Sequence, residues 1–295
     1  MVIVYSDKYF ADIGYHVFPI AKYRCVHERL LREAGIQTFL EPEPATGEQL
    51  LLVHTSEYLR DLQECQTTAS TAFSELPLTH EIVHMFVLTC GGTIRACREA
   101  AKGGWAIHLG GGFHHAFADK AEGFCYLNDL AVAARVAQKE ALVERIAIID
   151  CDLHQGNGSA NIFKEDASVF TFSIHQKDLY PVKETSDLDI HLPIHVTDED
   201  YLNHLRTAIP KILDEFEPGL ALYQAGADPY KHDQLGSLSL SIEGLQARDE
   251  LVFAECKQRN IPVVVTLGGG YAVNTEDTVQ IHFNTCLAAM EILGR

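Results

Sequence analysis

The chain has 295 residues, of which 47% are apolar, and its mean hydropathy of −0.02 is typical of a globular protein with a sizeable core. No apolar run is long enough to span a bilayer, so we expect no membrane partner. The formal net charge of −18 argues against a nucleic-acid surface, which would need a basic stripe, although it is compatible with cationic substrates.

The eight cysteines stand singly and no C-x-x-C pair occurs. Neither a disulfide framework nor a cysteine-rich zinc site is indicated, and we expect reduced thiols in a cytoplasmic protein. The first seven residues lack a basic region followed by an apolar one, so we expect no signal peptide and interpret them as the first strand. The sequence does not indicate an oligomeric state.

Short apolar runs rich in β-branched residues alternate along the chain with amphipathic segments. The expected strands are Val2–Tyr5, Trp105–His108, Ile146–Asp150, Val169–Ser173, Leu220–Tyr223 and Pro262–Leu267. The expected helices are Glu81–Ala101, Asn128–Leu142, Asp198–Phe216, Gly244–Asn260 and about Asn274–Leu293. This alternation predicts an α/β fold with a mostly parallel, doubly wound sheet and helices on both faces. Because no linker or repeat interrupts the pattern, we expect residues 1–295 to form a single domain.

Two stretches lack clear periodicity, Thr67–Pro77 and Gln176–Asp189. Most such loops are simple surface connections, but in α/β enzymes long loops often shape the site. They are therefore candidate site-lining segments.

A glycine-rich turn follows the expected strand at Trp105 and carries two adjacent histidines, His114 and His115. The glycines allow a sharp turn and a close approach to a ligand. A lone histidine is more often a structural residue, but a pair behind such a turn favours a pocket.

The expected strand at Ile146 ends in Asp150-x-Asp152-x-His154. If the strand alternation continues through these residues, all three side chains point to one side at the carboxyl end of the strand, where ligands bind in open α/β sheets. One Asp could simply cap the next helix, but two carboxylates and an imidazole on one side call for a divalent cation.

Two further turns follow strands. Asp228 comes after the strand at Leu220 and would supply a third ligand beside Asp152 and His154, leaving a position open for water or substrate. Tyr271 follows another triple glycine; it is either a packed aromatic or a hydrogen-bond donor to a developing oxyanion.

Five motifs taken together in this order resemble the histone deacetylase family, most closely its class IV branch and bacterial relatives. They are Gly110-Gly111-Gly112-Phe113-His114-His115-Ala116, Gly123-Phe124-Cys125-Tyr126-Leu127-Asn128-Asp129, Asp150-x-Asp152-x-His154-Gln155-Gly156-Asn157-Gly158, Gly226-Ala227-Asp228 and Gly268-Gly269-Gly270-Tyr271. The resemblance spans nearly the whole chain and implies the arginase–deacetylase fold in a single histone-deacetylase-like domain.

The resemblance implies roles for individual residues. Asp152, His154 and Asp228 would bind one zinc or ferrous ion. His114 and His115 would be the paired active-site imidazoles, with Asp150 behind His114 and Asn157 behind His115, and Tyr271 would donate to the oxyanion. Many family members have an aspartate where Asn157 stands, which would make His115 a weaker base here. The class IV pattern shares the asparagine, so activity is still expected.

Further positions match the family's substrate tunnel and a potassium site. The tunnel residues would be Gly123, Phe124, Tyr180, Leu235 and Gly269. The potassium site would involve Asp150, Asp152, His154, Ser173 and Ile174. The substrate-gripping aspartate of the family lies in a loop without a motif and cannot be mapped.

The resulting hypothesis is zinc-assisted hydrolysis of acyl groups, acetyl or longer, from lysine side chains of proteins or peptides. Acetylpolyamines or small N-acetyl amines are alternative substrates. An arginase-like dinuclear manganese hydrolase is another alternative. It would need more carboxylates around Asp150–His154 and Asp228, whereas Gln155 and Asn157 stand in place of potential ligands. A non-catalytic acyl-lysine-binding protein is a further alternative, disfavoured because the expected ligands and Tyr271 are present.

Overall fold

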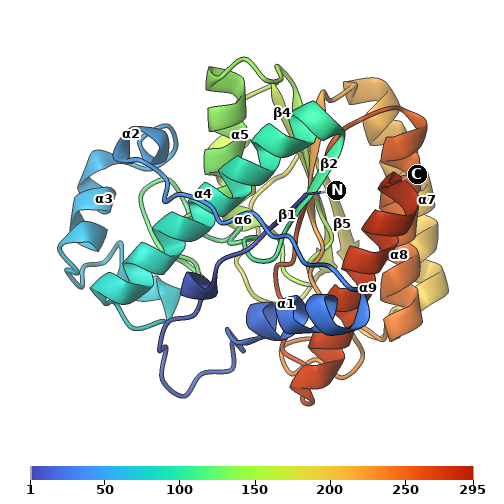
Figure 1. Ribbon diagram of the computed structural model, residues 1–295, viewed down its shortest axis with the longest axis horizontal. Helices are drawn as coiled ribbons and strands as arrows, with labels where there is room; N and C mark the ends of the chain where they lie inside the picture. Colours follow the sequence, from blue (N-terminus) through green and yellow to red (C-terminus); the bar gives the residue numbers. More distant parts are fainter. Residues whose placement is uncertain (1, 295) are drawn as a thin grey trace.

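Seven strands form one sheet in the computed structural model, which describes residues 2–294 (Figure 1). Every pairing between neighbouring strands is parallel. Across the sheet the strands are β1 (Ile3–Val4), β2 (Trp105–His108), β7 (Val263–Thr266), β6 (Leu220–Gln224), β3 (Ile146–Asp150), β4 (Val169–Gln176) and β5 (Leu188–Leu192).

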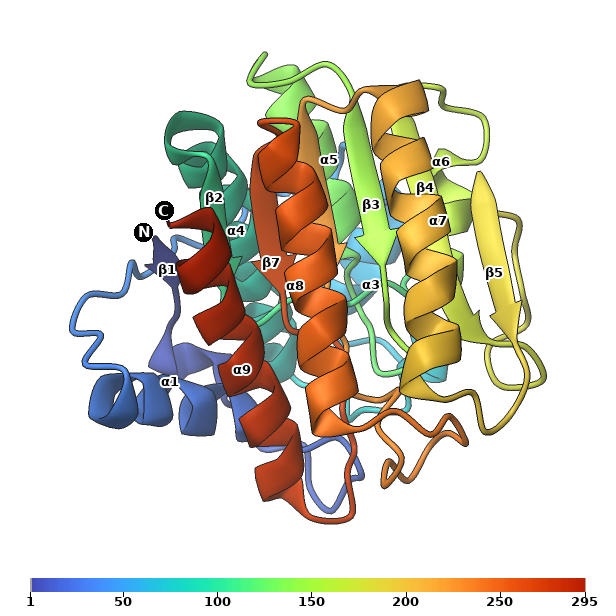
Figure 2. The ribbon, with the colours of Figure 1, turned by 90° about the vertical axis from the view of Figure 1, so that its right-hand side faces the viewer.

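Helices cover both faces of this sheet. Helices α7 (Asp198–Phe216), α8 (Ile242–Gln258) and α9 (Thr275–Leu293) pack on one face, and α4 (His80–Gly103) and α5 (Asp129–Lys139) lie on the other (Figures 1 and 2). The remaining helices are α1 (Lys22–Glu33), α2 (Gly47–Leu50), α3 (Ser56–Gln63) and α6 (Asn157–Phe163), with short 3-10 turns at Asp7–Tyr9 and Ala72–Ser74. The predicted fold class is confirmed.

The burial of a strand decides whether the sequence predicts it. Strand β3 is buried at every residue because it is flanked by β4 and β6 and covered on both faces, so it appears as a continuous apolar run. Strand β5 falls partly within the stretch expected to be a loop. It pairs only with β4 and keeps Asp189 and His191 at the sheet edge, so it has no such run.

The topology brings several loops to one edge of the sheet. Strands β2, β7, β6 and β3 are neighbours and point the same way, so the segments that follow their carboxyl ends meet. These are the segments that begin at Leu109, Leu267, Ala225 and Cys151. Among residues 2–294, no helix combines the length and the apolar character needed to cross a membrane.

Buried histidines outside these loops form part of the scaffold. His54 is 2% exposed, and its Nε2 accepts a hydrogen bond from the backbone N–H of Asn128 (3.2 Å), just before α5. Burial lowers the pKa of His54 to about 4. The imidazole is therefore neutral in the folded protein at neutral pH, which its acceptor role requires.

This burial predicts an acid-sensitive contribution to stability. The pKa of His54 is about 4 in the folded protein and 6.5 in the unfolded chain, so between these values only the unfolded chain binds the proton. Stability therefore falls as the pH falls through this window. We expect His54→Gln, which retains an acceptor oxygen, to remove about 2 kcal/mol of the stability loss between about pH 7 and about pH 5. Urea unfolding of both proteins at the two pH values measures the difference; equal losses would contradict it.

Candidate active site

Three buried side chains converge where β3 and β6 end. Asp152 and His154 follow β3, and Asp228 follows β6. One donor atom from each lies within 4.8 Å of the others. The Nδ1 of His154 is 3.1 Å from Asp228 Oδ2 and 3.4 Å from Asp152 Oδ1. These side chains could hold one ion.

The local backbone differs from the expected continuous strand. Strand β3 ends at Asp150, so alternation along a strand does not place Asp152 and His154, and that prediction is wrong. Instead, the Asp152 N–H donates to Asp150 Oδ1 (3.1 Å) and the His154 N–H donates to Asp152 Oδ1 (3.0 Å). Each aspartate thus hydrogen-bonds the backbone two residues on, as in an Asx turn. The alternate spacing of these residues does bring their side chains together, but two side-chain turns produce the geometry.

Backbone donors hold the two carboxylates in place. The Gly269 N–H donates to Asp152 Oδ2 (2.9 Å), and the Leu153 N–H donates to Asp228 Oδ1 (2.9 Å). Gly269 belongs to the segment that follows β7, so three strands contribute to the cluster. The bond to Leu153 leaves Asp228 Oδ2 on the side of His154.

The charge of this cluster favours a cation. Burial, and then the neighbouring Asp152, raise the pKa of the Asp228 carboxyl to about 7. The side chains of Asp152 and Asp228 are 2% and 0% exposed, and one imidazole does not offset two such carboxylates. An oxygen–nitrogen–oxygen donor set with net negative charge fits zinc or ferrous iron, and it leaves room for a non-protein ligand.

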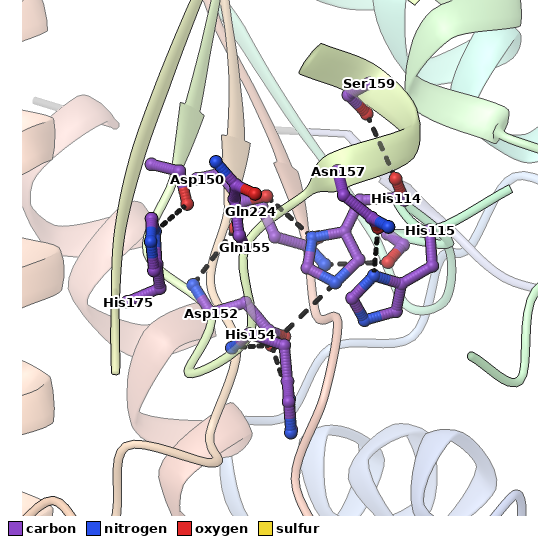
Figure 3. A network of polar contacts seen from close by, with 12 residues as sticks. His114, His115, Asp150, Asp152, His154, Gln155, Asn157, Ser159, His175 and Gln224 are labelled. Atoms are coloured by element: carbon purple, nitrogen blue, oxygen red, sulfur yellow. Dashed lines mark hydrogen bonds and ion pairs between the residues drawn. The ribbon is translucent and has the colours of Figure 1, made fainter. Parts of the chain in front are cut away.

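The two adjacent histidines have different partners (Figure 3). The Nδ1 of His114 is 2.6 Å from Asp150 Oδ2, and the Nδ1 of His115 is 2.8 Å from Asn157 Oδ1. Burial alone would lower the pKa of His114, but the carboxylates of Asp150 and Asp152 raise it to about 9. Burial, followed by the charge on His114, lowers the pKa of His115 well below its usual value. One imidazole is thus charged and its neighbour neutral at neutral pH.

A narrow cavity of about 190 Å³ opens onto His115 and His154. Binding sites for drug-sized ligands are usually about 300–1,000 Å³, so this one suits a single unbranched chain. It is lined by Glu75, His115, Gly123, Phe124, His154, Leu179, Tyr180, Leu235 and Tyr271. Four of the five predicted tunnel residues are among them. Gly269 is not: it lines a smaller inner cavity beside Asp152.

Both aperiodic stretches contribute to the cavity wall. Glu75 comes from the first, and Leu179 and Tyr180 come from the second. Glu75 has a left-handed backbone (φ 64°) directly after the 3-10 turn at Ala72–Ser74. No motif marks Glu75, so only the expectation of a site-lining loop pointed toward it.

Tyr271 lies at the inner part of the cavity wall, with its ring centroid 6.4 Å from that of His154. Burial and the nearby carboxylates raise the pKa of Tyr271 well above its usual value, which keeps the hydroxyl protonated. The buried Lys22 supports the Tyr271 loop, since its Nζ donates to the Gly268 carbonyl (2.6 Å) and lies 5.7 Å from the Tyr271 ring centroid. Sequence reasoning missed Lys22, because it stands 246 residues before its partner and belongs to none of the motifs.

Of the residues named for a potassium site, Asp150, Ser173 and Ile174 lie on adjacent strands, whereas Asp152 and His154 lie in the turns after β3. Asp150 of β3 is in register with Ser173 of β4, and Ile174 follows. The Ser173 hydroxyl lies 2.9 Å from His175 Nδ1. Potassium binding stays a prediction.

Comparison with known proteins identifies the histone deacetylase family. A family model for the histone deacetylase domain matches residues 16–286. An uncharacterized protein of Picosynechococcus sp. is 38% identical over 98% of this chain and 98% of its own length. Histone deacetylase 2 of Arabidopsis thaliana is 32% identical over 91% of this chain and 74% of its own length. A probable deacetylase of Archaeoglobus fulgidus is 31% identical over 92% of this chain and 81% of its own length. The crystal structure of the HDA15 HD domain superposes with a TM-score of 0.83, covering 100% of this chain and 91% of that one at 23% identity, which shows the shared fold.

The close backbone approach at Gly269 predicts a selective defect. An alanine methyl group there would lie 2.7 Å from Asp152 Oδ2 and closer still to Asp228 Oδ2, so both carboxylates must move. We expect Gly269→Ala to weaken zinc binding at least about tenfold and to lower the free energy of unfolding of the metal-free protein by about 1–3 kcal/mol. Competition with a chromophoric chelator measures the affinity.

Gly47→Ala is the matched control, because a methyl group at Gly47 meets nothing within 4 Å and lies in α2. It should leave zinc affinity unchanged and stability equal or slightly higher. Unaltered zinc affinity in Gly269→Ala would show that the carboxylates do not hold the ion.

Proposed function

This chain belongs to the histone deacetylase family and is a hydrolase of that family, and on this premise we propose that it is a zinc-dependent deacylase of lysine side chains. The observation that carries the proposal is the narrow cavity that leads to the cluster of Asp152, His154 and Asp228. A linear acylated side chain that enters there brings its amide to the part of the cavity wall where His115, His154 and Tyr271 meet.

Asp152, His154 and Asp228 would hold the ion, which when bound polarises the acyl oxygen and makes a water molecule more acidic. His115 would accept a proton from the attacking water and later give one to the leaving amine, as general base and then general acid. Its ring lines the cavity and is neutral before reaction, as a base must be. His114 remains charged beside Asp150 and stabilises the negative charge that develops.

Tyr271 would donate a hydrogen bond to the oxyanion that develops on the acyl group. Its hydroxyl is held protonated by burial, and its ring packs edge-on against Phe124 at a centroid distance of 5.8 Å, which restricts its position. The Lys22 contact with the Gly268 carbonyl fixes the start of the loop that carries it. A preorganised donor of this kind contributes without reorganisation at the moment of reaction.

The cavity walls support a lysine side chain as the substrate. Gly123, Phe124 and Leu235 contribute to a cavity wall that is mainly apolar, which suits the methylene chain of a lysine. Glu75 adds a carboxylate that could accept a hydrogen bond from a backbone N–H of a bound peptide.

The same carboxylate favours a second candidate substrate, a small N-acetylated polyamine. A distal ammonium group would pair with Glu75, and the net charge of −18 would attract such a cation. An assay with acetyl-lysine peptide, myristoyl-lysine peptide and acetylspermidine side by side distinguishes the two. If the polyamine is the substrate, Glu75→Gln should shift the preference from acetylspermidine toward the peptides. An unchanged preference would argue against the polyamine.

We keep four finer assignments as proposals. Asn157 supports placement in the class IV branch, and the single sheet supports residues 1–295 acting as one domain. A cytoplasmic location is supported by the eight free cysteines. The net charge of −18 supports acylated peptides or amines, and not nucleic acid, as partners.

Removal of the Tyr271 hydroxyl tests its assignment. We expect Tyr271→Phe to lower kcat by about 10²–10³ with little change in KM or zinc content, because the lost hydrogen bond acts mainly on the developing oxyanion. Steady-state kinetics on an acetyl-lysine peptide, with metal analysis of the same sample, provides the measurement. Turnover at the wild-type rate would refute this assignment.

Neutralising Asp228 tests the metal assignment independently of turnover. Zinc should raise the Tm of the wild type, since it binds the folded state, and we expect this rise to be lost in Asp228→Asn. The metal-free variant should be at least as stable as the metal-free wild type, because burial already disfavours the Asp228 charge. Asp119→Asn, at an exposed position that does not belong to the cluster, is the control and should respond to zinc normally. A full zinc response in Asp228→Asn would exclude Asp228 as a ligand.

A further inference from the structure

The Glu122 carboxylate is connected to the His115 imidazole through the side chain of Asn157. The Oδ1 of Asn157 is 2.8 Å from His115 Nδ1, and the Asn157 Nδ2 donates to Glu122 Oε1 (2.8 Å). Asn157 is 1% exposed, and the Glu122 side chain is 15% exposed. His115, Asn157 and Glu122 therefore form a continuous hydrogen-bonded chain from the cavity to the rim (Figure 3 shows its inner part).

The chemistry of the three groups fixes the direction of every hydrogen bond in this chain. An ionised carboxylate only accepts, so the amide atom that faces Glu122 must be the NH₂ group. The amide oxygen of Asn157 must then face His115, and an oxygen acceptor requires Nδ1–H as its donor. In the neutral imidazole, Nε2 is consequently left without a proton and with a free lone pair. Without Glu122, no group in this series of hydrogen bonds would prevent the Asn157 amide from rotating by about 180° and selecting the opposite tautomer of His115.

We propose that Glu122 is a positioning residue for the reaction: it orients the Asn157 amide and thereby holds His115 in the tautomer whose Nε2 can accept a proton. This rests on the proposed function of His115 as the base. It also assigns a reason for an asparagine where many family members have an aspartate, because a carboxylate at position 157 would face Glu122 directly.

Glu122 is itself held firmly. Its backbone N–H donates to the Cys125 carbonyl (3.1 Å), and the Cys125 N–H donates back to the Glu122 carbonyl (2.9 Å). Its second carboxylate oxygen, Oε2, accepts from Lys120 Nζ (2.7 Å). The carboxylate is thus tied to a tight turn and balanced by a cation, and its remaining oxygen is directed to Asn157.

The neighbouring histidine shows the alternative arrangement. His114 has the Asp150 carboxylate directly on its Nδ1 (2.6 Å), with no intervening amide. A direct carboxylate needs no further residue to orient it, because both of its oxygens accept. His115 has an amide instead, which offers a donor at one end and an acceptor at the other, so a third group must decide between them.

A double-mutant cycle at positions 122 and 157 distinguishes orientation of His115 from mere support of the turn. With Asn157 present, Glu122→Ala should lower kcat by about 10- to 100-fold with KM within about twofold of wild type, the range seen when an orienting partner is lost. Asn157→Asp should also be impaired, because it places two carboxylates against each other. In that background Glu122→Ala should raise kcat by about tenfold, since the introduced carboxylate orients His115 unaided.

A change of sign of the Glu122→Ala effect between the two backgrounds supports the proposal. An equal loss in both would overturn it and would show that Glu122 only supports the turn. Glu57→Ala, at an exposed position on α3, is the matched control and should leave kcat unchanged in both backgrounds. Thermal unfolding of all variants verifies that each is folded.

A spectroscopic reading keeps the test independent of turnover. In the zinc-loaded wild type labelled with ¹⁵N-histidine, His115 should show a protonated Nδ1 and an unprotonated Nε2, assigned by comparison with His115→Gln. Glu122→Ala should show a mixture of tautomers, and retention of the wild-type tautomer would overturn the proposal. If the wild type has no turnover on any acylated amine, the proposed function fails, while this spectrum still decides whether Glu122 orients His115.

Discussion

The structure depends on how two buried carboxylates and one imidazole are held together at the edge of a parallel sheet. Asp152 and Asp228 are almost completely buried, and each has one oxygen tied to a backbone N–H. These bonds position the carboxylates, but burial, and then the charge of Asp152, still raise the pKa of Asp228. A cation between them resolves the conflict, so the same arrangement that is costly without an ion makes a binding site.

The second constraint is that two adjacent imidazoles must differ. His114 and His115 have ring centroids 4.1 Å apart, and both cannot be charged at that distance in a buried site. Their partners separate them: Asp150 supports the charge on His114, whereas the Asn157 amide gives His115 orientation without a direct counter-charge. Because Glu122 lies on the turn that also presents Gly123 and Phe124 to the cavity, this one turn would support both the proposed base, His115, and the cavity wall.

The sequence predicts these parts unevenly, and the reasons are physical. Strand β3 is recognisable because burial on both faces demands a continuous apolar run, and β5 is not recognisable because an edge strand has no such demand. The convergence of Asp152, His154 and Asp228 could be predicted because each follows a strand at the same edge. The mechanism that places Asp152 and His154 could not, since Asx turns and strand alternation give the same spacing. Lys22, Glu75 and Glu122 act through contacts between segments far apart in the chain, and only the folded structure shows them.

The central claim is that one imidazole and two carboxylates, and no sulfur, bind the ion. X-ray absorption at the zinc edge of the loaded enzyme tests this most directly. We predict oxygen and nitrogen neighbours at about 2.0–2.2 Å, with outer-shell scattering from a single imidazole. A sulfur neighbour at about 2.3 Å, or scattering from two or more imidazoles, would contradict the account and would mean that the ion is held by cysteine or by the His114–His115 pair instead.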